Sequence, residues 1–186
     1  PIFLVDMTGL FNGDLLGATT VGEVWRIKST GDATKIANTP LPAHLEGLQV
    51  VPNFPARFGP LAGKIIAGAE EEGVLYAFGM DGSIQTYNVG VLIEDIDIVL
   101  PRENFFGVNY GTSQLLGAPA QEFAGMVGDI LLTQETHSSV GLYRLYWNGS
   151  ALTAQEIPIT AQSFVPGQWE HVTFAAAGIK EIPPPN

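Results

Sequence analysis

The chain has no cysteine, few cationic side chains and no long apolar run. Without cysteine it cannot form a disulfide framework, a cysteine-ligated zinc site or a thiol nucleophile. Only 8 Lys and Arg face 19 Asp and Glu, a net charge of −11, which argues against binding to nucleic acid or to an anionic membrane surface. No apolar run is long enough for a transmembrane helix, so we expect no membrane insertion.

Several catalytic and nucleotide-binding motifs are also missing. The sequence has no Gly-x-Ser-x-Gly nucleophile elbow, no phosphate-binding loop and no dinucleotide fingerprint. No signal peptide is visible, and the chain begins at Pro1 within a strand-like run. We therefore expect a processed product, and a lack of cysteine does not argue against export.

What the sequence does contain is a pattern that occurs three times. Each copy opens with a glycine before an apolar run, at Gly13, Gly63 and Gly128. A second glycine and strand-like run follow nine, ten and thirteen residues later, and then come a Gly-Asp, Asp-Gly or Asn-Gly turn pair and a further strand. Repeats of about 40–50 residues with several strands each are typical of propeller blades.

Apolar and polar residues alternate along these runs, as expected for strands with one buried face. We predict one all-β domain over residues 1–178, a β-propeller or partial propeller of four-stranded antiparallel blades. The repeats lie near 13–44, 45–92 and 93–168, with a closing strand at 169–175 and a proline-rich tail at 179–186.

The phase of the repeats suggests how the ring closes. The pattern begins on the second strand of a blade, so Trp169–Phe174 would supply the missing first strand and remove an exposed edge. An insert over 104–121, with two predicted strands at 105–109 and 114–118, is either a truncated further blade or an elaborated connection. Because three repeats hardly close a ring, we expect a homo-oligomer in which two chains complete one; the alternative is a piece of a longer propeller.

Three glutamates occupy equivalent places before or within the first strand of a blade, namely Glu46, Glu94 and Glu170. The symmetry of a propeller would bring them together near one mouth of the central channel. Carboxylates that converge in this way suit calcium, which takes six to eight oxygen ligands. The alternative is that each glutamate caps backbone N–H groups at the start of its strand.

Other polar residues flank this predicted calcium site. Asp95 should point to the polar side of its strand and add a ligand. The acidic run that begins at Glu70, with Glu135 at the matching place in the third repeat, is interpreted as a solvated loop. His44 and His171 are candidate general bases for a metal-bound water, or else ordinary exposed histidines.

Aromatic residues align across the repeats at Trp25, Tyr76 and Tyr143. Large flat side chains at this place indicate packing between blades. The alternative is a platform on which a sugar stacks, so a glycan or small-molecule ligand stays open.

The segment Leu45-Glu46-Gly47-Leu48, followed by a Gly-x-apolar-apolar run and an aromatic strand, resembles the gluconolactonase/regucalcin and NHL-type propellers. Residues 105–111 with 114–116 resemble an NHL-type hairpin. The resemblance implies carboxylates around the channel that can hold calcium. The chain also resembles exported bacterial propellers that precede a proline-rich sorting tail.

We therefore expect a secreted acidic β-propeller with a calcium site in its channel, acting as a binding, scaffold or assembly module. The alternative is a metal-dependent lactonase or esterase, with Glu46, Glu94 and Glu170 as ligands and His44 or His171 as the base.

Overall fold

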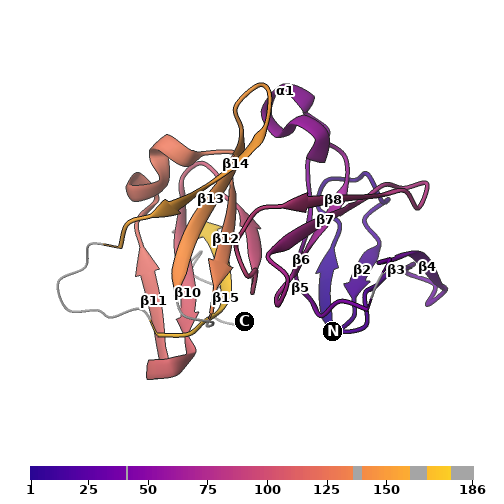
Figure 1. Ribbon diagram of the computed structural model, residues 1–186, viewed down its shortest axis with the longest axis horizontal. Helices are drawn as coiled ribbons and strands as arrows, with labels where there is room; N and C mark the ends of the chain where they lie inside the picture. Colours follow the sequence, from indigo (N-terminus) through magenta and orange to yellow (C-terminus); the bar gives the residue numbers. More distant parts are fainter. Residues whose placement is uncertain (41, 136–139, 160–166, 177–186) are drawn as a thin grey trace, which may run out of the picture.

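Four antiparallel sheets are arranged as the blades of a β-propeller in the computed structural model (Figure 1). The structure describes residues 1–40, 42–135, 140–159 and 167–176. The predicted tail at 179–186 therefore lies outside the described residues. The all-β propeller prediction is confirmed, because the strands form four small antiparallel sheets arranged as blades.

The blades are numbered here by the order of their inner strands, β1, β5, β9 and β15. From inner to outer edge, blade 1 contains β1 (Ile2–Val5), β2 (Leu15–Ala18), β3 (Glu23–Ile27) and β4 (Ala33–Asn38), and blade 2 contains β5 (Leu45–Val50), β6 (Ile65–Ala69), β7 (Val74–Phe78) and β8 (Ile84–Asn88). Blade 3 contains β9 (Ile96–Ile98), β12 (Ile130–Gln134), β13 (Gly141–Trp147) and β14 (Leu152–Ile157) in the same order. Blade 4 contains β15 (Trp169–Ala176), β10 (Glu103–Asn109) and β11 (Gln114–Ala118). Short helical segments are α1 (Pro55–Phe58), η1 (Gly59–Leu61), η2 (Tyr110–Thr112) and η3 (Ala120–Met126).

The predicted closure by Trp169–Phe174 is wrong. The first strand of blade 1 is β1, which pairs with β2 in the register Phe3↔Gly17 and so already covers that edge. The strand β15 pairs instead with β10, in the register Phe105↔Phe174. Its apolar face explains the choice, since Phe174 packs edge-on against Phe105 and Phe123.

The insert thus forms part of a further blade, the first of the two alternatives. The hairpin of β10 and β11 leaves blade 3 after β9 and returns to it at β12. The inner strand of this fourth blade, β15, arrives only at the end of the described chain. Figure 1 shows blade 4 at the left, blade 1 at the right and blades 2 and 3 between them.

Three apolar clusters fill the spaces between successive blades. The first joins blades 1 and 2 through residues such as Leu16 and Ile65. The second joins blades 2 and 3 through residues such as Ile66 and Leu132, and the third joins blades 3 and 4 around Phe105. The strand β6 contributes Ile65 and Ala67 to the first cluster and Ile66 to the second, and β12 contributes to the second and third clusters in the same way. This is why β6 is apolar throughout and β12 is apolar over residues 130–132.

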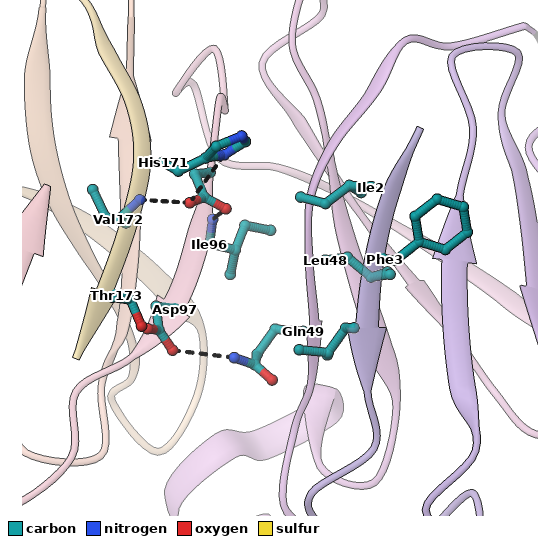
Figure 2. A pocket seen from close by; sticks show the side chains of 11 residues that line it. Ile2, Phe3, Leu48, Gln49, Ile96, Asp97, His171, Val172 and Thr173 are labelled. Carbon is teal, nitrogen blue, oxygen red and sulfur yellow. Dashed lines mark hydrogen bonds and ion pairs between the residues drawn. The ribbon is translucent and has the colours of Figure 1, made fainter. Parts of the chain in front are cut away.

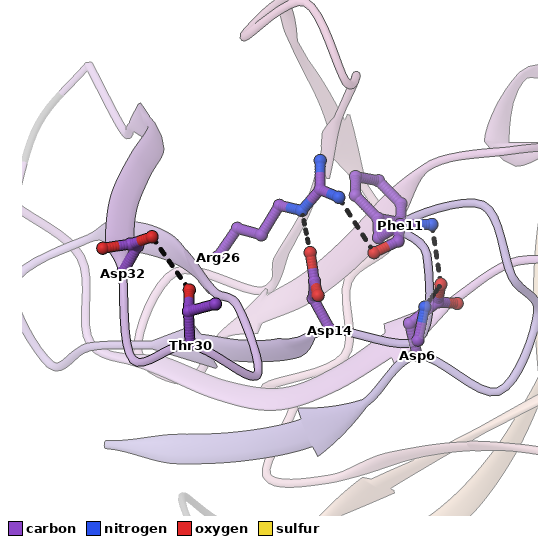
Figure 3. A network of polar contacts seen from close by, with 7 residues as sticks. Asp6, Phe11, Asp14, Arg26, Thr30 and Asp32 are labelled. Atoms are coloured by element: carbon purple, nitrogen blue, oxygen red, sulfur yellow. Dashed lines mark hydrogen bonds and ion pairs between the residues drawn. The ribbon is translucent and has the colours of Figure 1, made fainter.

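Ion pairs recur between the second and third strands. In blade 1 the loop before β2 is held by Asp6, which accepts a hydrogen bond from Phe11 N–H at 2.6 Å, and Arg26 Nε lies 2.6 Å from Asp14 (Figure 3). In blade 3 the equivalent pair is Arg144 and Asp129, 3.0 Å apart. Both aspartates directly follow the glycine that opens a repeat.

Gly47 lets the inner strands of blades 2 and 3 approach closely. Its φ is +60°, it lies at a register shift between Glu46 and Leu48, and a Cβ there would lie 2.7 Å from Ile96 N and 2.9 Å from the carbonyl carbon of Asp95. We predict that Gly47→Ala lowers the free energy of unfolding by at least about 2 kcal/mol, from the left-handed backbone and the overlap with a rigid strand. Urea denaturation measures this. Gly31→Ala, at φ +89° with open space around it, is the control and should lose only the conformational part.

Candidate cation site at the channel mouth

Residues of the four inner strands line a cavity of about 370 Å³. Figure 2 shows Ile2 and Phe3 of β1 on one side of it and Val172 and Thr173 of β15 on the other. Gln49 of β5 and Asp97 of β9 lie between them, joined by a hydrogen bond of 3.2 Å from the amide Nε2 to the carboxylate. The channel of the propeller is therefore lined by both polar and apolar side chains.

Four acidic side chains and one histidine gather where the second strands of blades 2 and 3 end. The carboxylates of Glu70, Glu94 and Glu135 each offer an oxygen within 4.8 Å of the other two. His44, Glu46 and Glu70 form a second group with the same spacing, so Glu70 belongs to both. Since calcium lies about 2.4 Å from each ligand, oxygens on opposite sides of one ion are about 4.8 Å apart. Either group is compact enough to hold a single cation.

Backbone pairing sets the positions of these side chains. The N–H of Glu70 donates to the carbonyl of His44 at 3.2 Å, which continues the pairing of β5 with β6. The N–H of Glu94 donates to the carbonyl of Thr133 at 2.9 Å, which extends the pairing of β9 with β12. Two neighbouring blades thereby present their acidic residues at the same mouth of the channel.

Glu94 is the most enclosed member of this cluster. Its side chain and backbone together are only 7% exposed, and the described residues donate no hydrogen bond to its carboxylate. Burial, reinforced by the charges of Glu46, Glu135, Glu70 and Glu170, raises its pKa to about 8. A buried carboxylate in this environment is either protonated or neutralised by a bound cation.

His44 joins two of the acidic residues. Its Nε2 lies 2.8 Å from Glu46 and its Nδ1 lies 3.2 Å from Glu70. Burial raises the pKa of Glu46, while the neighbouring histidine opposes that rise. Each ring nitrogen of His44 thus has a carboxylate as its neighbour.

Asp95, which was also predicted as a ligand, has a different environment from the clustered glutamates. Its carboxylate accepts hydrogen bonds from Ile96 N–H at 2.8 Å and from Val172 N–H at 2.7 Å. Asp97 acts in the same way, accepting from Phe174 N–H at 3.0 Å. The two aspartates connect β9 to β15, and neither belongs to the groups of clustered carboxylates found among the described residues.

His171 and Glu170 lie at the start of β15. His171 lines the channel cavity, with its Nδ1 3.8 Å from Asp95. That carboxylate raises the pKa of His171 to about 8, so the imidazole is protonated at neutral pH. The charge of Glu170 contributes to the raised pKa of Glu94, but Glu170 is not a member of either compact group.

The structure thus brings together Glu46, Glu94 and His44 from the predicted set, and adds Glu70 and Glu135, which sequence reasoning had assigned to a solvated loop. A signal for these two was present in the repeats, because both directly follow the second strand of their blade. Equivalent places in the pattern become neighbours around a propeller axis.

Comparison with known proteins gives no family assignment. No protein-family model and no curated protein matches the chain. Among solved structures it is similar to a streptogramin B lyase at 16% identity, with 84% of this chain covered and a TM-score of 0.43. It is also similar to virginiamycin B lyase from Staphylococcus aureus at 15% identity, with 80% covered and a TM-score of 0.40. The matched part spans 54% and 53% of those two chains, respectively.

These likenesses carry no assignment of activity. Within the described residues, no helix is both long and apolar enough to cross a membrane.

Proposed function

We propose that this protein is a binding, scaffold or assembly module that holds a divalent cation, calcium by its oxygen-rich donor set, at the acidic mouth of its channel. The observation that carries the proposal is the environment of Glu94, which is buried among other carboxylates. Glu94 is only 7% exposed, and its carboxylate offers an oxygen within 4.8 Å of those of Glu70 and Glu135, so its ionised form is favoured only beside a positive partner such as a cation. Glu70, Glu94 and Glu135 are the proposed ligands, with backbone carbonyls and water completing the shell.

The proposed location is extracellular. Free calcium is abundant there, and sites in extracellular modules work with dissociation constants of about 10⁻⁴–10⁻³ M. The resemblance to calcium-holding gluconolactonase-type and NHL-type propellers supports the same choice of ion, and the resemblance to exported propellers supports secretion. A partly exposed cluster of three carboxylates is consistent with affinity in that range.

For the lactonase or esterase alternative, neither of the two histidines predicted as the base is well placed for that role in the described part of the chain. His44 has a carboxylate at each ring nitrogen, and His171 carries a proton at neutral pH. A general base must have a free lone pair at the working pH. We therefore favour the binding module over the hydrolase.

Calorimetric titration with calcium tests the proposal. We expect the wild-type chain to bind one calcium ion, and saturating calcium at about 10 mM to raise the melting temperature, since a ligand specific for the native state stabilises it. Glu94→Gln should abolish both effects. Glu71→Gln is the matched control, because it removes the same charge from an exposed neighbour outside the cluster, and it should keep both. The absence of heat and of a thermal shift in the wild type would refute the calcium site.

A further inference from the structure

In blades 2 and 3, side chains at equivalent positions of the repeats face the preceding blade, which covers them. In β6 the residues Ile65 and Ala67 face blade 1, and in β12 the residues Ile130 and Leu132 face blade 2. All four are apolar and buried. In the third strands the equivalent pairs are Tyr76 with Phe78 and Tyr143 with Leu145, which pack in the same two clusters.

Blade 1 carries the same apolar pattern on a face that no preceding blade covers in the described chain. The equivalents of the buried residues above are Leu15, Gly17, Trp25 and Ile27, and the first strand adds Phe3 and Val5 to the same face. Phe3 is 57% exposed and Val5 is 51% exposed, with the Phe3 ring lying over Gly17. We call this surface the blade-1 open face; it is made of Phe3, Val5, Leu15, Trp25 and Ile27.

Blade 4 has a second open face, on its side away from blade 3, that no other described blade covers. Phe105 points into the core with blade 3, so its neighbours Phe106 and Val108 point away from it, and the pairing of Val108 with Leu115 puts Leu115 on the same side. Leu115 is 70% exposed. We call Phe106, Val108 and Leu115 the blade-4 open face.

The geometry points to a second copy of this chain as the partner of both open faces. In each of the three apolar clusters, the side of one blade that faces along the chain packs against the side of the next blade that faces back. Among the described residues, one chain carries one open face of each kind, so the blade-4 open face of one copy can cover the blade-1 open face of another. Two copies joined head to tail at both ends form a closed ring with two equivalent interfaces. Exposed apolar patches of this kind mark interaction surfaces, and this inference is independent of the cation site.

Sedimentation equilibrium tests this ring. We expect a species of twice the chain mass of 19.8 kDa. The chain concentration is about 100 µM, well above the dissociation constant of a stable dimer. The salt concentration is about 0.15 M, which screens the repulsion between two acidic chains. Phe3→Asp and Leu115→Asp should each weaken association at least about tenfold. Met80→Asp is the control, since Met80 is 60% exposed on the hairpin between β7 and β8, away from both faces, and it should stay dimeric.

Mixing the two variants separates this arrangement from others. A Phe3→Asp chain keeps its blade-4 open face and a Leu115→Asp chain keeps its blade-1 open face, so the mixture regains one intact interface and dimerises more strongly than either variant alone. A wild-type monomer, an open polymer, or a dimer that only one of the two substitutions weakens would each overturn the head-to-tail ring. Near-ultraviolet circular dichroism verifies folding, and Val5→Asp with Val108→Asp replaces any variant that fails to fold.

Discussion

Glu94→Gln is expected to stabilise the protein at pH 8 in the presence of a chelator, by on the order of 2–4 kcal/mol. The folded-state pKa of Glu94 is about 8, raised from 4.5 by burial and by the surrounding carboxylates. Between these two pH values the folded chain holds a proton that the unfolded chain has released. The wild-type free energy of unfolding therefore falls as pH rises from about 4.5 to 8, while a neutral amide of the same shape avoids this loss.

Urea denaturation at pH 5 and pH 8 in EDTA measures this effect. The difference between wild type and Glu94→Gln should be small at pH 5 and large at pH 8. Saturating calcium should narrow the difference between the two proteins at pH 8, because only the wild type gains the free energy of binding. Equal pH dependence of the two proteins would show that Glu94 ionises in the fold without penalty. The exposed control Glu71→Gln should follow the wild type at both pH values.

Asp129→Ala is expected to lower the free energy of unfolding by about 3 kcal/mol. Asp129 is only 1% exposed and lies between two guanidinium groups, those of Arg57 and Arg144. Arg57 also donates to the carbonyl of Gly128 at 3.1 Å, so the aspartate anchors α1 of blade 2 to blade 3. Its removal leaves two cations facing each other without a counter-ion. The loss stays at the lower end of the range for buried pairs because both arginines are partly hydrated.

Two further variants make this second prediction specific. Burial raises the pKa of Asp129, although the two arginines oppose that rise, so the charge itself is not favoured by its surroundings. Asp129→Asn, which keeps the shape and removes the charge, should thus lose less stability than Asp129→Ala. Asp14→Ala removes the equivalent residue of blade 1, which pairs with one arginine nearer the surface, and should cost about 1 kcal/mol or less. Equal losses at the two aspartates would contradict the role assigned to Asp129. Urea denaturation at pH 7 measures all three.

The repeat pattern was sufficient to predict the blades because its signals are local. Alternating side chains and Asp-Gly or Asn-Gly pairs depend on backbone geometry within a few residues, so the strands of blades 2 and 3 could be read directly from the sequence. The strands of the insert could be located as well, since 105–109 and 114–118 fall within β10 and β11. The equivalence of Glu46 and Glu94 also followed from the repeat, and it placed two of the clustered acidic residues.

Strand partners and side-chain neighbours required the tertiary structure. Nothing local distinguishes β1 from β15 as the first strand of blade 1; the choice depends on whether Phe174 finds the aromatic core around Phe105. Likewise Asp95 is next to Glu94 in sequence, yet alternation sends its carboxylate to the N–H of Val172 and away from the cluster. The sequence by itself determined the strands and turns of this propeller, because those are set by local backbone preferences. The pairing of distant strands and the identity of the carboxylates that meet at the channel were decided only by the packing of blades far apart in the chain.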